Sequence, residues 1–265
     1  MDTERVTLRH LPGGSAASVT LREPCGRDEI AVEGVDTRAA VALLERLLRG
    51  HEPAVPGAMD LAASDRDALL ASLHRQLWGD RVRSTLPCTG CGKRFDVAFE
   101  LSTLQRHLGE ASGDWRAVVG GAIANADGDT WRVPTAREEM DAIAEDARGA
   151  AARLAARVGV GAGDITRAAR ALEAGAPIID AEIEAACAEC GAAQLTHFDL
   201  QSFVLQRLLD ERPALLAEVH VLADGYGWSL REILALERRT RRALAALVAE
   251  ARSRAAARPP RVALP

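Results

Sequence analysis

The chain has 265 residues, of which 48% are hydrophobic and 27% charged, an ordinary globular composition. A chain of this length can bury a sizeable core without a metal or a disulfide framework. Its formal net charge of −5 argues against a nucleic acid as the main partner. No apolar run approaches the roughly 18 residues of a membrane span, and the mixed-charge start does not form a signal peptide. We therefore expect a cytoplasmic protein whose cysteines are thiols or metal ligands.

Residues 1–60 predict an N-terminal β/α segment. Short strands are expected at 6–8 and 17–21, followed by a helix that Asp36 or Thr37 caps and that reaches Leu48. Residues 51–59, which contain two prolines, predict a linker. Ser64 to Asp67 form a variant capping box, with Asp in place of Glu, that predicts a second helix ending before Gly79.

The middle of the chain mixes strands and helices. Strands are expected at 82–86 and 95–99, on either side of the first cysteine pair, and at 178–187 before the second. Between them, Asp127-Gly128 predicts a tight turn before a strand at 131–133. The capping box from Thr135 to Glu138 predicts one helix over 136–157, and Asp164 caps another that ends near Gly175.

The C-terminal part reads as helical. Helices are expected over 201–209, after Pro213, and from Leu230, where Ser229 and Glu232 form a third capping box. An Arg-rich helix follows, and the proline-containing residues 259–265 should fray.

Two CxxC motifs, each followed by glycine, give the clearest chemical signal. Such a turn points two thiolates at one metal, and two turns together supply four thiolates in a tetrahedron, which suits zinc and leaves no position for substrate. The resemblance between the motifs extends further, because Phe99-Glu100-Leu101 follows the first and Phe198-Asp199-Leu200 the second. We therefore predict one structural Zn²⁺ per chain, with these ligands: Cys88, Cys91, Cys187 and Cys190.

Other chemistry stays open for these cysteines. An iron–sulfur cluster is possible, as is replacement of one thiolate by His197, seven residues past Cys190. A thioredoxin-like redox pair is disfavoured because neither motif opens a helix after a βαβ pattern. Cys25, in the Pro24-Cys25-Gly26 turn, has no partner motif. No catalytic constellation stands out, so we expect no enzyme.

These patterns predict an α+β fold. A zinc ribbon built from two distant CxxC β-hairpins would occupy 61–212, with a mostly helical insertion at 103–176. A C-terminal helical hairpin would span 213–258 and a frayed tail 259–265.

The C-terminal hairpin also predicts a surface for a protein partner. Tyr226 and Trp228 flank a glycine ahead of a capped helix, where aromatic side chains are readily presented. Clustered arginines in the next helix suit charge-assisted contacts to carboxylates. The plainer interpretation is a hairpin that packs on its own chain with a solvated basic face. The candidate partner-binding residues are Tyr226, Trp228, Arg238, Arg239, Arg241 and Arg242.

Several of these elements occur together in an order that resembles the T4-type phage baseplate protein family, as found in extracellular contractile injection system clusters. The resemblance spans most of the chain. It rests on Leu21–Pro24 with Gly26 and Asp28-Glu29, on Ser64–Asp67 through Gly79–Arg81, on the two CxxCG motifs, on Arg132–Thr135, and on Tyr226–Ser229 followed by Glu232–Leu234.

The resemblance implies a non-enzymatic role in assembling or supporting a phage-tail-like contractile injection apparatus. Its partners would then be other baseplate, hub or tail proteins, with no small-molecule substrate. The alternative function is a zinc-ribbon protein that binds nucleic acid or acts in transcription, against which the acidic charge and the lack of basic–aromatic interleaving weigh.

Overall fold

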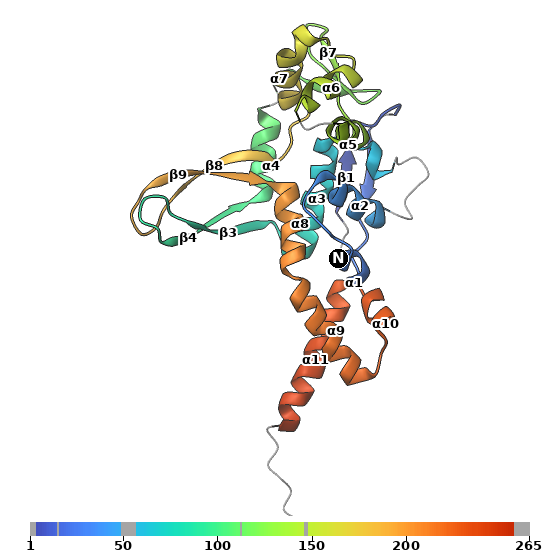
Figure 1. Ribbon diagram of the computed structural model, residues 1–265, viewed down its shortest axis with the longest axis vertical. Coiled ribbons are helices and arrows are strands. Elements are labelled where there is room, and N and C mark those ends of the chain that lie inside the picture. Colours follow the sequence, from blue (N-terminus) through green and yellow to red (C-terminus); the bar gives the residue numbers. More distant parts are fainter. Residues whose placement is uncertain (1–3, 15, 49–56, 112, 146–147, 257–265) are drawn as a thin grey trace, which may run out of the picture. The chain divides into compact units, whose positions relative to one another are not determined.

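The computed structural model describes residues 4–14, 16–48, 57–111, 113–145 and 148–256, which form helices and small antiparallel sheets (Figure 1). The expected mixture of α and β structure is confirmed. Contacts divide the chain into unit 1, residues 1–22 and 34–205, and unit 2, residues 23–33 and 206–265. This differs from the predicted division, because residues 23–33 join the C-terminal helices and the boundary falls at 205/206. Most of the predicted linker and all of the predicted tail lie outside the described residues.

Unit 1 begins with a β-hairpin and three helical elements. Strand β1 (Arg5–Leu8) pairs with β2 (Ala17–Thr20), and α2 (Thr37–Leu47), the 3₁₀ turn η1 (Ala58–Asp60) and α3 (Ala63–Trp78) follow. The predicted cap at Asp36 is confirmed, since its carboxylate accepts a hydrogen bond from the Ala39 amide at 2.9 Å. The leucines of α2 and most leucines of α3 are buried, as their helical spacing predicts, whereas Leu77 near the end of α3 is half-buried.

The predicted capping box at Ser64 is wrong, because α3 starts at Ala63 with Ala62 as its N-cap. Its acidic residues instead hold other segments in place. Asp65 accepts hydrogen bonds from the backbone amides of Arg9 and His10 at 2.8 and 2.9 Å, and Asp67 accepts one from Ile179 at 2.7 Å. Both carboxyl groups are buried. The local sequence predicts a cap because the capping pattern involves only neighbouring residues. The amides that these carboxylates bind lie far away in the chain.

The segment predicted as a helical insertion contains a sheet as well. After α4 (Leu101–Glu110), the strands β5 (Arg116–Val118), β6 (Ala122–Ala124) and β7 (Thr130–Arg132) form an antiparallel sheet. The predicted single helix over 136–157 is two helices, α5 (Ala136–Glu145) and α6 (Ala150–Arg157). The turn η2 (Ala162–Asp164) and α7 (Ile165–Gly175) complete the segment, and Ile123 of β6 is buried with Ala171 of α7.

Two hairpins make up what we call the arm. Strand β3 (Arg81–Pro87) pairs with β4 (Arg94–Glu100), and β8 (Asp180–Ala186) pairs with β9 (Ala193–Asp199). The two hairpins lie side by side in Figure 1. Helix α4 follows the first directly, and α8 (Leu200–Asp210) follows the second. Each half is thus one copy of the same structural repeat, strand–turn–strand–helix, and the strands of the two copies have equal length.

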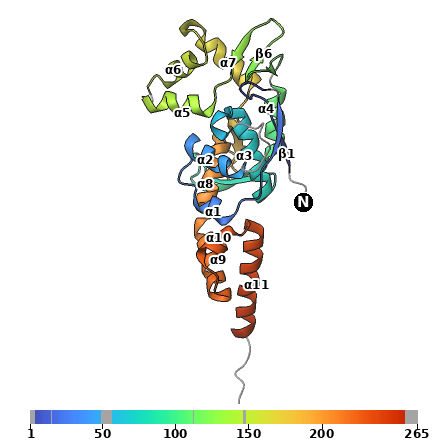
Figure 2. The ribbon, with the colours of Figure 1, turned by 90° about the vertical axis from the view of Figure 1, so that its right-hand side faces the viewer.

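Unit 2 is helical. It contains the short α1 (Gly26–Ile30), α9 (Arg212–Tyr226), α10 (Leu230–Ala235) and α11 (Arg238–Ala256). Helices α9 and α11 lie side by side in both views (Figures 1 and 2), and Leu222, Ile233 and Val248 are buried between the helices. The capping box from Ser229 to Glu232 is confirmed. No helix in the described ranges is long and apolar enough to cross a membrane.

Buried ion pairs hold α1 against α11. Glu29 of α1 accepts hydrogen bonds from Arg238 at 2.7 Å and from Arg241 at 2.8 Å, and Glu218 of α9 also pairs with Arg241 at 2.7 Å. The two arginine side chains are only 3% and 1% exposed. Burial lowers the pKa of Arg238 to about 10, so its guanidinium stays charged at neutral pH.

The location of these arginines corrects one prediction. Arg238 and Arg241 stabilise unit 2 from within and are not presented to a partner, because their guanidinium groups are buried against carboxylates of the same unit. Gly26 belongs to the same arrangement. A Cβ there would lie 2.8 Å from a methyl group of Leu234 and 3.0 Å from the Arg241 guanidinium, so only glycine lets α1 approach this closely.

Asp67 predicts a pH-dependent stability. Burial raises its pKa to about 7, from 3.8, so the folded state retains a proton that the unfolded state has lost between about pH 4 and 7. The free energy of unfolding should therefore fall as pH rises through this window, by up to roughly 4 kcal/mol. Asp67→Asn, which keeps an acceptor for the Ile179 amide, should flatten this dependence in denaturant titrations. The exposed Asp127→Asn is the control, and an unchanged profile for Asp67→Asn would contradict the prediction.

Replacing Glu29 with Gln tests the buried ion pairs. The change keeps the side-chain shape but leaves two buried guanidinium groups without their shared carboxylate. We expect a loss of about 3–5 kcal/mol in the free energy of unfolding of unit 2. Glu237→Gln, at an exposed position, should have little effect. Equal stability of the two variants would show that the network contributes nothing.

Candidate metal centre

Each CxxC motif forms a compact turn, or knuckle, between two strands. The knuckles are residues 88–92 and 187–191, and their hydrogen bonds correspond one to one. The Gly92 amide donates to the Cys88 carbonyl at 2.9 Å, and the Gly191 amide donates to the Cys187 carbonyl at 2.8 Å. Gly92 and Gly191 have φ angles of +72° and +73°, a region that favours glycine. The glycine after each motif is therefore required by the turn itself.

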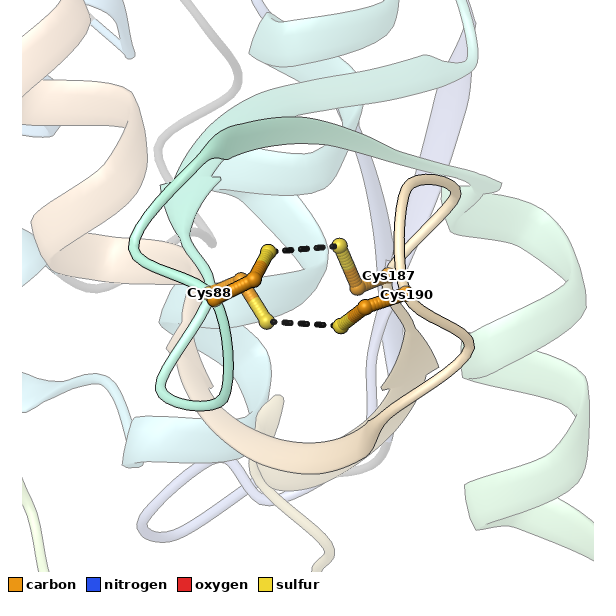
Figure 3. Close-up of side chains that lie close together, drawn as sticks. Cys88, Cys187 and Cys190 are labelled. Carbon is orange, nitrogen blue, oxygen red and sulfur yellow. Dashed lines mark hydrogen bonds between the residues drawn. The ribbon is translucent and has the colours of Figure 1, made fainter.

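The structure brings the four predicted cysteines together. Their sulfur atoms all lie within 4.8 Å of one another. Cys88 Sγ is 3.6 Å from Cys190 Sγ, and Cys91 Sγ is 3.9 Å from Cys187 Sγ, so each close pair joins the two knuckles (Figure 3). Each pair also combines one buried thiol with one exposed thiol. The arrangement can hold a metal ion.

Contacts between the hairpins keep the knuckles aligned. Phe95 is buried beside Cys88 and Cys187, and Phe99 meets Phe198 edge-on with ring centroids 5.0 Å apart. Gln194 accepts a hydrogen bond from the Thr89 amide at 3.0 Å and donates one to the Pro87 carbonyl.

Two further contacts at the knuckles add to this alignment. Lys93 pairs with Glu189 at 2.7 Å. Gly90 approaches the other hairpin so closely that a Cβ would lie 3.2 Å from the Cβ of Ala192. The roles of Gln194 and Gly90 were not predicted from the sequence. Only Gly90 could have been noticed there, because it is a glycine inside the CxxC motif.

The electrostatics of the thiols favour binding of a cation. The backbone amides of Cys91 and Gly90 lower the pKa of the Cys88 thiol to about 7. The Lys93 amide also favours a thiolate at Cys91, but desolvation and the three neighbouring thiols outweigh it and raise the Cys91 pKa to about 12. Four adjacent thiolates are not stable together without a positive charge between them. A bound metal ion supplies that charge and displaces the remaining protons.

The other sequence candidates lie away from this centre. His197 is on the outer face of β9, 61% exposed and 3.2 Å from Asp180, so it does not replace a thiolate. Cys25 is half-buried at the N-cap of α1 in unit 2.

In unit 2, Tyr226 and Trp228 are 43% and 36% exposed, and their rings stack with centroids 4.7 Å apart. Arg242 pairs with Glu211 and Glu218, whereas the side chain of Arg239 is exposed.

Comparisons with known proteins gave no family. No protein-family model, curated protein or solved structure matched the chain.

Metal binding should depend on pH and on Cys190. We expect one divalent ion per chain in metal-replete protein. Its affinity should fall as pH decreases, because thiol protons compete with the metal, and more steeply below about 7, where Cys88 also becomes protonated. Cys190→Ser removes one ligand and should weaken binding at least about tenfold and lower the melting temperature. Cys25→Ser is the matched control, because serine also caps a helix. Competition titration with a chromogenic chelator measures the affinity, and equal metal content in both variants would contradict the assignment.

Proposed function

We propose that the metal is zinc and that the arm is a split zinc ribbon. Four thiolates in tetrahedral geometry at a Zn–S distance of about 2.3 Å would place their sulfurs roughly 3.8 Å apart. The close pairs at 3.6 and 3.9 Å match that spacing. Four protein ligands fill the coordination shell, so the ion has no open position for a substrate, and its role is structural.

We further propose that the protein is a non-enzymatic component or assembly factor of a phage-tail-like contractile injection apparatus. Two features support this. The ordered motifs resemble the T4-type phage baseplate family along most of the chain. In unit 2, the stacked Tyr226 and Trp228 are exposed, next to the exposed Leu230, as expected for an aromatic docking site on a partner protein.

The identity of the metal can be tested directly. Elemental analysis of protein purified without chelators should find one zinc and no stoichiometric iron. Replacement by Co²⁺ should give intense thiolate-to-cobalt absorption and d–d bands typical of tetrahedral coordination. Octahedral spectra, or iron with acid-labile sulfide, would contradict a zinc ribbon.

Trp228→Ala tests the docking surface. Because Trp228 is exposed, its truncation should change the melting temperature of the isolated protein only slightly. The number of complete particles formed with the other proteins of the proposed apparatus should drop several-fold. Leu216→Ala, an exposed apolar residue of α9, is the control. A folded variant that assembles particles normally would exclude Trp228 as an anchor. An unfolded variant would show that the Trp228 side chain is needed for folding of the protein itself.

Binding of purified wild-type protein to DNA and RNA distinguishes this function from the alternative, nucleic-acid binding. With Arg238 and Arg241 buried, the remaining arginines of α11 should support only weak, salt-sensitive binding to DNA or RNA. Submicromolar binding that survives physiological salt would favour the alternative function.

A further inference from the structure

The outward-facing rows of strands β3 and β8 carry opposite charge. Residues of β3 and β4 that alternate with the packed Val82, Leu86 and Phe95 point away from the second hairpin. On β3 these include Arg81 and Arg83, and on β8 the corresponding outward row is Asp180, Glu182 and Glu184. The rows therefore lie on opposite sides of the arm.

The charge reversal occurs at equivalent positions of the repeat. The register pairs Arg81 with Glu100 in the first hairpin and Asp180 with Asp199 in the second, so Arg81 corresponds to Asp180 and Arg83 to Glu182. Backbone bonds agree with this alignment, because the Leu101 amide donates to the Asp80 carbonyl at 3.0 Å and the Leu200 amide to the Ile179 carbonyl at 2.9 Å. The backbone repeats, but the charge of the outer row changes sign.

Four of these side chains have no charged partner in the part of the chain that the structure describes, whereas Asp180 lies 3.2 Å from His197. Among the described residues, Arg81, Arg83, Glu182 and Glu184 form no ion pair. The arginines line a depression of about 490 Å³ on the first hairpin, with Thr85 and Asp96. Asp96 accepts a hydrogen bond from the Thr85 hydroxyl at 2.7 Å, and the structure shows no ion pair between its carboxylate and either arginine of this depression.

We propose that the β3 row of one chain docks against the β8 row of a second copy. Neighbouring charges in each row are two residues apart on one strand, about 7 Å, so two ion pairs form at once with matched spacing. Because the two rows lie on opposite sides of the arm, one second copy does not meet both at once. The contact is therefore head-to-tail and extends to further copies, either in a closed ring or in an open filament.

Two properties of the rows favour a second copy as the occupant. The acidic row has the spacing that the basic row requires, and both are present at equal concentration in any preparation of the chain. The chain's net charge of −5 opposes association at long range, so attraction depends on the local rows and is weakened by salt. The inference rests on the arm's geometry and does not require the proposed function.

Variants in which the charge of one row is reversed test the inference. Sedimentation velocity of metal-replete wild-type protein should show association that grows with concentration at low ionic strength and disappears in high salt. Arg81→Glu with Arg83→Glu, and separately Glu182→Arg with Glu184→Arg, should each weaken association at least about tenfold. An equimolar mixture of the two variants should restore it, because each reversed row then meets its complement. Arg170→Glu with Arg254→Glu makes the same change in net charge as the first variant, on other exposed positions, and should leave association unchanged.

Three results would overturn the proposal: a wild-type chain that stays monomeric at low ionic strength, reversal variants that associate like the wild type, or a mixture that remains monomeric. Retention of a poly-glutamate peptide by a monomeric wild-type chain, lost in Arg81→Glu with Arg83→Glu, would show that the basic row serves a different acidic partner.

Discussion

The structure of the arm depends on the convergence of four thiols from two distant parts of the chain. Residues 93–186 lie between the knuckles, and closing a loop of this length costs little more than closing one half as long. The segment between them can therefore hold a sheet and several helices without preventing the two hairpins from meeting. What must be compensated is the mutual repulsion of four thiolates within 4.8 Å, and a bound cation does this directly.

The two halves of the arm share a backbone but not a surface. Equal strand lengths, equivalent knuckle hydrogen bonds and the Phe99–Phe198 contact make the metal centre nearly symmetric. The outward side chains are free from these requirements, because alternation along a strand separates the packed face from the solvent face. The outward row of β3 is basic and that of β8 is acidic, while the cysteine centre between them is the same in both halves.

Unit 2 relies on a different interaction. Its apolar cluster is small, and the shared carboxylate of Glu29 fixes α1 to α11 through two buried guanidinium groups. Buried ion pairs add little net stability, but they penalise any arrangement that leaves a charge without its partner. The α1–α11 arrangement is specified in this way, and the exposed aromatic pair near α10 remains available for other contacts.

The sequence by itself determined the four cysteines, the glycines that end both knuckles, the paired strands and most helices, because these follow from local spacing and turn chemistry. The tertiary structure alone decided which polar side chains are buried. Asp65 and Asp67 lie in a segment that predicts a capping box, yet they accept hydrogen bonds from the amides of Arg9, His10 and Ile179. Arg238 and Arg241 read as surface charges, yet they face Glu29, more than 200 residues earlier in the chain. Local patterns report periodicity and backbone conformation, whereas the partner of a buried charge depends on which distant segment the fold places beside it.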